Sequence, residues 1–141
     1  MAAVMVAFFS PPVSAPSTVP AAVAARAARS ALSRQEALHD IPLGVGLKPM
    51  GQAMSRDGSR LYVTTGRGRK VLTIDTAAEK IVASVDAGDR PWGVALSPDE
   101  KLLFTANGLS NDVSVIDVAS NRVLRKVKVG ERPWGVIALP R

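Results

Sequence analysis

Short apolar segments separated by Gly, Pro, Asn and Asp make up most of the chain after residue 40. These segments are rich in β-branched and aliphatic residues, which favours strands. Turn residues recur about every 8 to 12 positions, which leaves no room for long amphipathic helices. The pattern predicts two sets of four strands, over residues 51–55, 60–64, 71–74 and 81–85, and over residues 93–97, 102–106, 113–116 and 123–127.

The two sets of strands belong to a 42-residue sequence repeat without gaps. A basic-Pro-Met/Trp-Gly segment opens it three times at even spacing, at Lys48–Gly51, Arg90–Gly93 and Arg132–Gly135. Four short antiparallel strands in a unit of about 40 to 50 residues are typical of a β-propeller blade. The sequence therefore predicts an all-β fold, a partial β-propeller.

The repeat count predicts two full blades, over residues 46–87 and 88–129, within a repeat segment spanning 41–141. His39–Val45 is predicted to be the last strand of a preceding blade, because Leu43 aligns with Val85. Gly130–Arg141 is predicted to be the first strand of a following blade. Propellers close with about four to eight blades, so two blades leave open edges. We expect a piece of a longer propeller, with a ring assembled from several copies as the alternative.

The repeats resemble YVTN-type β-propeller repeats. The similarity lies in the Arg-Pro-Trp-Gly-Val openings, the Ser-Pro-Asp turn at 97–99 and the Asn107–Asp117 run. The naming tetrapeptide is imperfect, as Tyr-Val-Thr-Thr at 62–65 and Phe-Thr-Ala-Asn at 104–107. The resemblance implies secreted and surface proteins of bacteria and archaea, or proteins associated with pyrroloquinoline quinone-dependent alcohol oxidation. Related propellers include lactonases and the haem-binding propeller of nitrite reductases.

Residues 1–40 lie outside the repeat and are rich in Ala, Pro, Ser and Val. Their composition predicts a disordered or partly helical leader. An apolar stretch and an Ala22-Val23-Ala24 site resemble a secretory signal, but the positive n-region is missing because the first basic residue is Arg26. The apolar run is too short to span a bilayer, which takes about 20 residues. A signal here implies a periplasmic or extracellular protein, and a cytoplasmic one follows otherwise.

The sequence contains few residues that could act in catalysis or in metal binding. There is no cysteine and one histidine, His39, which we expect to be a surface or packing residue. Asp57, Asp75, Asp99 and Asp117 recur with the repeat in turns, so we expect them to bond backbone rather than a metal. The net charge is +6, but the basic residues are spread out and aromatics make up 4% of the chain, which argues against nucleic-acid binding. We therefore expect no enzyme, cofactor or metal site.

The repeated opening is the best candidate for a binding site. In a propeller the first strand of each blade lines the central channel, so its basic and Trp residues recur around one rim. The candidate contacts are Lys48, Arg90, Trp92, Arg132 and Trp134. Such a rim suits a protein segment or an anionic small molecule. The alternative role for these residues is packing between blades. The expected function is a binding scaffold of the cell envelope, and the alternative is a fragment of a propeller enzyme or redox-associated protein whose active site lies in other blades.

Overall fold

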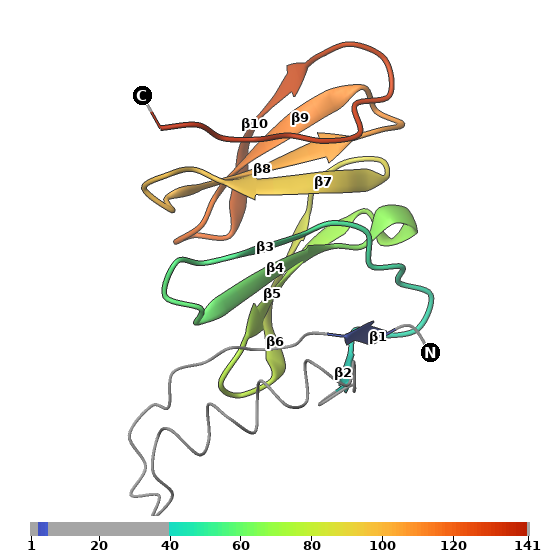
Figure 1. The fold of residues 1–141 in the computed structure, drawn as a ribbon. Coiled ribbons are helices and arrows are strands. Elements are labelled where there is room, and N and C mark those ends of the chain that lie inside the picture. The colour runs from blue at the N-terminus through green and yellow to red at the C-terminus, as the bar shows by residue number, and fades with distance from the viewer. Residues whose placement is uncertain (1–2, 6–39, 141) are drawn as a thin grey trace, which may run out of the picture.

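The computed structural model describes residues 3–5 and 40–140 (Figure 1). The leader predicted over residues 1–40 and His39 lie almost wholly outside the described residues. Two four-stranded antiparallel sheets follow one another along the chain and stack face to face, as Figure 1 shows. The partial propeller of four-stranded blades is therefore confirmed.

The first blade has the strand order β3-β4-β5-β6, and the second has the order β10-β9-β8-β7, so each is a simple meander. The strands match the predicted segments to within two residues. The first blade holds β3 (Gln52–Met54), β4 (Arg60–Thr64), η1 (Gly66–Gly68), β5 (Lys70–Asp75) and β6 (Lys80–Asp86). The second holds β7 (Pro91–Leu96), β8 (Leu102–Asn107), β9 (Asp112–Asp117) and β10 (Arg122–Lys128).

The backbone repeats its special conformations at the spacing of the sequence repeat. Both outer strands carry a β-bulge, between Thr73 and Ile74 in the β5–β6 register and at Val123/Arg125 in the β9–β10 register. Left-handed residues also pair across the repeats. The pairs are Gly58 and Glu100, Arg69 and Asn111, Glu79 and Asn121, and Arg90 and Arg132. The turns therefore keep their geometry even where the residue is not the Gly or Asn that this conformation favours.

The core between the blades is apolar at its centre. Tyr62, Val71 and Val85 of the first blade pack on Leu103 and Ile116 of the second. Because side chains alternate across a strand, the residues next in sequence to these point to the other side of their own sheet. Those residues face away from the other blade.

The face of the first blade that is turned away from the second is covered by the segment before it. Ile41 and Leu43 pack there with Leu61 and Ile74. Leu43 lies one repeat before Val85, and Leu61 and Ile74 lie one repeat before Leu103 and Ile116, so the two clusters are built alike. The short β2 (Asp40–Pro42) pairs with β1 (Ala3–Met5). Thus the segment predicted as a preceding strand does supply packing, but its ladder partner comes from the N-terminus.

The segment that follows the second blade differs from the sequence prediction. The ladder partner of a first strand is the second strand of its own blade, and the described residues after 130 include no such strand, so none forms over residues 130–140. Residues 130–132 bend and residues 133–140 continue without secondary structure, and the red segment of Figure 1 crosses the second blade. In the first blade, Gly66–Gly68 between β4 and β5 form one turn of 3-10 helix.

A buried polar cluster lies beside the apolar core, on the face of the second blade turned toward the first. Asn107 Nδ2 donates to Asp112 Oδ1 (2.7 Å) and to Ser114 Oγ (2.8 Å), and its Oδ1 accepts from Thr105 (3.0 Å). Ser114 Oγ donates to the carbonyl of Ala87, in the linker that joins the blades (3.0 Å). Because every member is bonded, the cluster holds the linker at little cost in unpaired polar groups.

Candidate functional site

The five candidate residues lie at one end of the sheets, where loops from both blades meet. The β8–β9 loop is bonded to the linker before β7, since the amides of Gly108 and Leu109 donate to the carbonyls of Arg90 and Asp89 (both 3.0 Å). The amide of Lys48 donates to the carbonyl of Thr65 at the corresponding loop of the first blade (3.4 Å). We call this end, with Lys48, Arg90, Trp92, Arg132 and Trp134, the basic rim.

The cations of the basic rim are presented by repeated backbone geometry. Arg90 and Arg132 have φ angles of 54° and 48°, in the left-handed region. The Arg132 amide donates to Asn111 Oδ1 at 2.9 Å, which fixes its position. Among residues 40–140, neither guanidinium takes part in a hydrogen bond or ion pair, so both are available to an anion.

The two tryptophans form a stack whose outer member is open. Their ring centroids lie 4.2 Å apart with 23° between the planes. Trp92 is half-buried on the backbone of Gly108, where an added Cβ would lie 2.2 Å from its ring. Trp134 is 69% exposed. Packing thus accounts for Trp92, whereas most of the Trp134 surface faces solvent. In the first repeat Met50 takes the equivalent place, over Gly66.

Shallow grooves flank the rim loops in both blades. The groove of the second blade has a volume of about 320 Å³ and is lined by Gly108, Leu109, Asn111, Glu131 and Arg132.

The groove at the corresponding end of the first blade has a volume of about 410 Å³, and two charged residues that line it, Arg69 and Asp86, are already paired within the protein. Arg69 Nε lies 2.8 Å from Asp89 and Lys70 Nζ lies 2.9 Å from Asp86. The lysine beside Asp86 holds the pKa of this carboxyl below its ordinary value. We therefore regard the groove beside Arg132 as the better anion site, because its guanidinium is not already neutralised.

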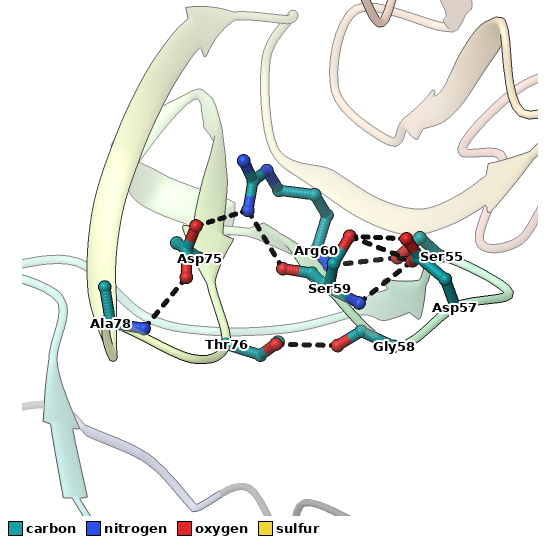
Figure 2. Close-up of polar contacts among 8 residues, drawn as sticks. All are labelled: Ser55, Asp57, Gly58, Ser59, Arg60, Asp75, Thr76 and Ala78. Atoms are coloured by element: carbon teal, nitrogen blue, oxygen red, sulfur yellow. Dashed lines mark hydrogen bonds and ion pairs between the residues drawn. The ribbon is translucent and has the colours of Figure 1, made fainter. Parts of the chain in front are cut away.

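The repeated aspartates serve turns at the opposite end, as predicted. In Figure 2 the Asp57 carboxylate accepts from the hydroxyl of Ser55 and from both the amide and hydroxyl of Ser59, and Asp75 accepts from the amide of Ala78 and pairs with Arg60. The hydrogen bond from Ser55, together with those from Ser59, lowers the pKa of Asp57 to about 2.

Asp99 and Asp117 repeat the arrangement with the amides of Lys101 and Ser120. Hydrogen bonds from Ser97 and Ser120 also lower the pKa of these two carboxyls. These four residues hold turns. In the described part of the chain no three His, Asp or Glu side chains gather as metal ligands would. That same part contains no helix long and apolar enough to cross a membrane.

The candidate residues named from the sequence do not include all of the residues that line the groove. Asn111 and Glu131 line it, and neither was a candidate. The signal that would have found them is the sequence repeat, in which their positions are equivalent to those of Arg69 and Asp89, the ion pair of the first blade.

Comparison with solved structures identifies the class. Hydrazine synthase of Kuenenia stuttgartiensis is 30% identical with a TM-score of 0.64, over 70% of this chain and 30% of that one. Dihydro-heme d1 dehydrogenase NirN, in complex with DHE, is 24% identical with a TM-score of 0.62, over 77% and 24%. The β-propeller domain of Cps50 (Swd1) from Myceliophteria thermophila is 16% identical with a TM-score of 0.57, over 63% and 28%.

The chain is thus a β-propeller repeat protein, and its two blades span less than a third of each of these structures. No protein-family model matches it, and no curated protein sequence does. The resemblance to YVTN repeats therefore rests on the residues quoted above.

Proposed function

We propose that this protein is a non-enzymatic binding scaffold whose contact surface is the basic rim. The observation that carries the proposal is the open indole of Trp134, stacked on Trp92 and two residues after Arg132, whose guanidinium has no partner among residues 40–140. An exposed aromatic plane offers apolar contact at low cost in conformational entropy, and a guanidinium recognises carboxylate or phosphate. The partner is a protein segment or small molecule with an anionic group beside a flat apolar surface.

The test uses naphthalene-2,6-disulfonate as a planar dianionic probe, with tryptophan fluorescence of the full chain as the readout. We expect Arg90→Ala/Arg132→Ala and Trp134→Ala each to weaken binding at least about tenfold, with little change in melting temperature. The matched control is Lys80→Ala/Arg122→Ala, which removes two cations that are also one repeat apart but lie at the start of the outer strands. Equal weakening by the control, or a large loss of stability in the Arg variants, would assign the rim to general charge or to packing.

We further propose a location in the cell envelope. The apolar start of the chain and the Ala22-Val23-Ala24 site support it. Fractionation of cells that express the tagged chain, with mass determination of the product, tests the proposal. A full-length product in the cytoplasm is the opposing result.

The alternative function is a part of a propeller enzyme or redox-associated protein. The similarity to hydrazine synthase and to a dehydrogenase supports it, since this chain corresponds to a fraction of each. The DNA on both sides of the coding segment distinguishes the two functions. Further blades at the same repeat spacing with histidines on their inner strands would favour the enzyme. Their absence would favour the scaffold.

A further inference from the structure

The dipeptide Asn107-Gly108 stands at the end of β8, where the second blade meets the linker. The chain contains three asparagines, and only Asn107 is followed by glycine. An asparagine before glycine is the pair most open to deamidation, because the glycine has no Cβ to hinder attack of its amide nitrogen on the asparagine side chain. The equivalent pair in the first blade is Thr65-Gly66, which cannot undergo this reaction.

Deamidation of this pair needs water and no other reactant. The Gly108 nitrogen forms a bond to Cγ of Asn107, the Cγ–Nδ2 bond breaks, and ammonia carries away the proton of the Gly108 amide. Water then opens the cyclic imide at either carbonyl, which gives an aspartate or an isoaspartate whose backbone runs through the former side chain. The reaction therefore requires a mobile Asn107 side chain and a free Gly108 amide.

The folded chain provides neither condition. The Gly108 amide donates to the carbonyl of Arg90 at 3.0 Å, so its nitrogen is turned toward the linker. Asn107 is 0% exposed, and its side chain is held by three hydrogen bonds of 2.7, 2.8 and 3.0 Å. The linker backbone covers this side chain, since an added Cβ on Gly88 would lie 2.6 Å from Asn107 Cγ. Attack on Cγ is therefore blocked while the second blade is closed on the linker.

The product would replace the donor at the centre of the polar cluster by an anion. Asn107 Nδ2 donates to Asp112 Oδ1 at 2.7 Å, and Asp112 is 4% exposed, so an aspartate at 107 would place two buried carboxylates side by side. Lys128, the ion-pair partner of Asp112 among residues 40–140, lies 3.9 Å away and is 81% exposed, so it neutralises little of the added charge. Ser114 could donate to the new carboxylate only by releasing the Ala87 carbonyl. The cluster therefore cannot re-form after deamidation.

The same dipeptide supports the basic rim. The Gly108 amide fixes the carbonyl of Arg90, and the Gly108 backbone lies against the ring of Trp92. An isoaspartate at position 107 adds a methylene to the backbone at this point, which displaces the Gly108 amide from its acceptor. Deamidation would thus disturb the rim as well as the contact between blade and linker.

We propose that Asn107 is a deamidation site controlled by the fold. The pair is inert while the second blade is closed on the linker, it reacts when this blade opens, and its product keeps the blade from closing again. Opening of the blade is thereby converted into a permanent chemical change. The inference does not depend on what the basic rim binds.

The first test compares rates of deamidation in mild alkali, measured by mass spectrometry of the peptide that contains residue 107. We expect the chain unfolded in guanidinium chloride to react at least about tenfold faster than the folded chain. The matched reference is Arg122→Gly, which creates a second Asn-Gly pair in the turn between β9 and β10. In the folded variant, Asn121 should react at least about tenfold faster than Asn107. Equal rates at position 107 in the folded and unfolded chains would overturn the inference.

The second test examines the product. Asn107→Asp should lower the melting temperature at neutral pH by about 10 °C or more, because it buries a second carboxylate. Asn107→Asp/Asp112→Asn, in which the amide and the carboxylate exchange places, should recover much of this loss. A double variant no more stable than Asn107→Asp, or an Asn107→Asp chain as stable as the unchanged chain, would contradict the proposed effect of the product.

Discussion

Part of one side of the sheet is apolar in the first blade and polar at the equivalent positions of the second. Val63 and Leu72 face the N-terminal segment within an aliphatic cluster. At the equivalent positions of the next repeat, Thr105 and Ser114 belong to the hydrogen-bonded cluster around Asn107. The strands, bulges and turns are nevertheless alike. The comparison teaches that turn geometry holds the blade shape, while the packed face is free to adapt to whatever segment lies against it.

Replacing an apolar residue of the first blade by the polar residue at the equivalent position of the second should give the largest loss of stability. Leu72→Ser places a hydroxyl in an aliphatic cluster that offers it no partner, and removes a side chain that is 3% exposed. We expect a loss of about 4 kcal/mol in the free energy of unfolding, measured by urea denaturation. The control Leu109→Ser, at a side chain that is 56% exposed, should change it by no more than about 0.5 kcal/mol. Similar losses in the two variants would show that the first blade does not depend on an apolar face.

Substitution at the centre of the polar cluster should give the second largest loss of stability. Asn107→Ala removes the donor to Asp112 and Ser114 and the acceptor for Thr105, all buried. We expect a loss of roughly 3 kcal/mol, because buried polar groups lose their partners. Thr65→Ala, at the equivalent position, breaks only a local pair of bonds with the backbone of Lys70 and should cost about 1 kcal/mol. A loss no greater than that of the control would mean that the cluster does not hold the linker.

Substitution by alanine at two equivalent glycines should destabilise the fold for different physical reasons. Gly108→Ala meets the Trp92 ring, so we expect a loss of about 2 kcal/mol and disappearance of the coupled tryptophan signal in the near-ultraviolet circular dichroism. Gly66→Ala meets the flexible Met50 and a φ of +51°, so it should cost about 1 kcal/mol and leave that signal intact. Persistence of the signal in Gly108→Ala would show that the stack does not rest on this glycine.

The turn aspartates should give the smallest effect, seen as pH dependence. The pKa of Asp57 falls from 3.8 to about 2 in the folded chain, and those of Asp75, Asp99 and Asp117 are also lowered. A carboxyl with a lowered pKa stabilises the fold above its unfolded pKa, and the contribution is lost as pH falls through the folded pKa. The melting temperature should therefore decrease between about pH 4 and pH 2, and less so in Asp57→Asn. An equal slope in that variant would contradict the assignment to Asp57.

The sequence was sufficient to predict the blades because the repeat records them twice. Turn residues such as Asp57 and Asp99 act through their own backbone, so their role follows from local sequence alone. The residues of the basic rim could be named from the sequence because they open each repeat, and their binding role stays a prediction.

The rest depended on contacts between distant segments. From the sequence alone, a serine in a strand such as Ser114 is expected to face solvent. In the structure its hydroxyl donates to the carbonyl of Ala87, in a distant segment. Arg90 and Arg132 show no local preference for the left-handed conformation that the linkers impose on them. Residues 130–140 form no strand in the structure. A first strand needs a second strand beside it to complete a ladder, and the described residues after 130 contain none.

The central claim is that the two blades stack face to face, so that Val85 of the first is 8% exposed while the equivalent Val127 of the second is 41% exposed. The chain has no cysteine, so a single thiol can report on each position. We predict that Val127→Cys reacts with a thiol reagent at least about tenfold faster than Val85→Cys under native conditions, because a thiolate must be accessible to react. Equal rates, or faster reaction at position 85, would contradict the account.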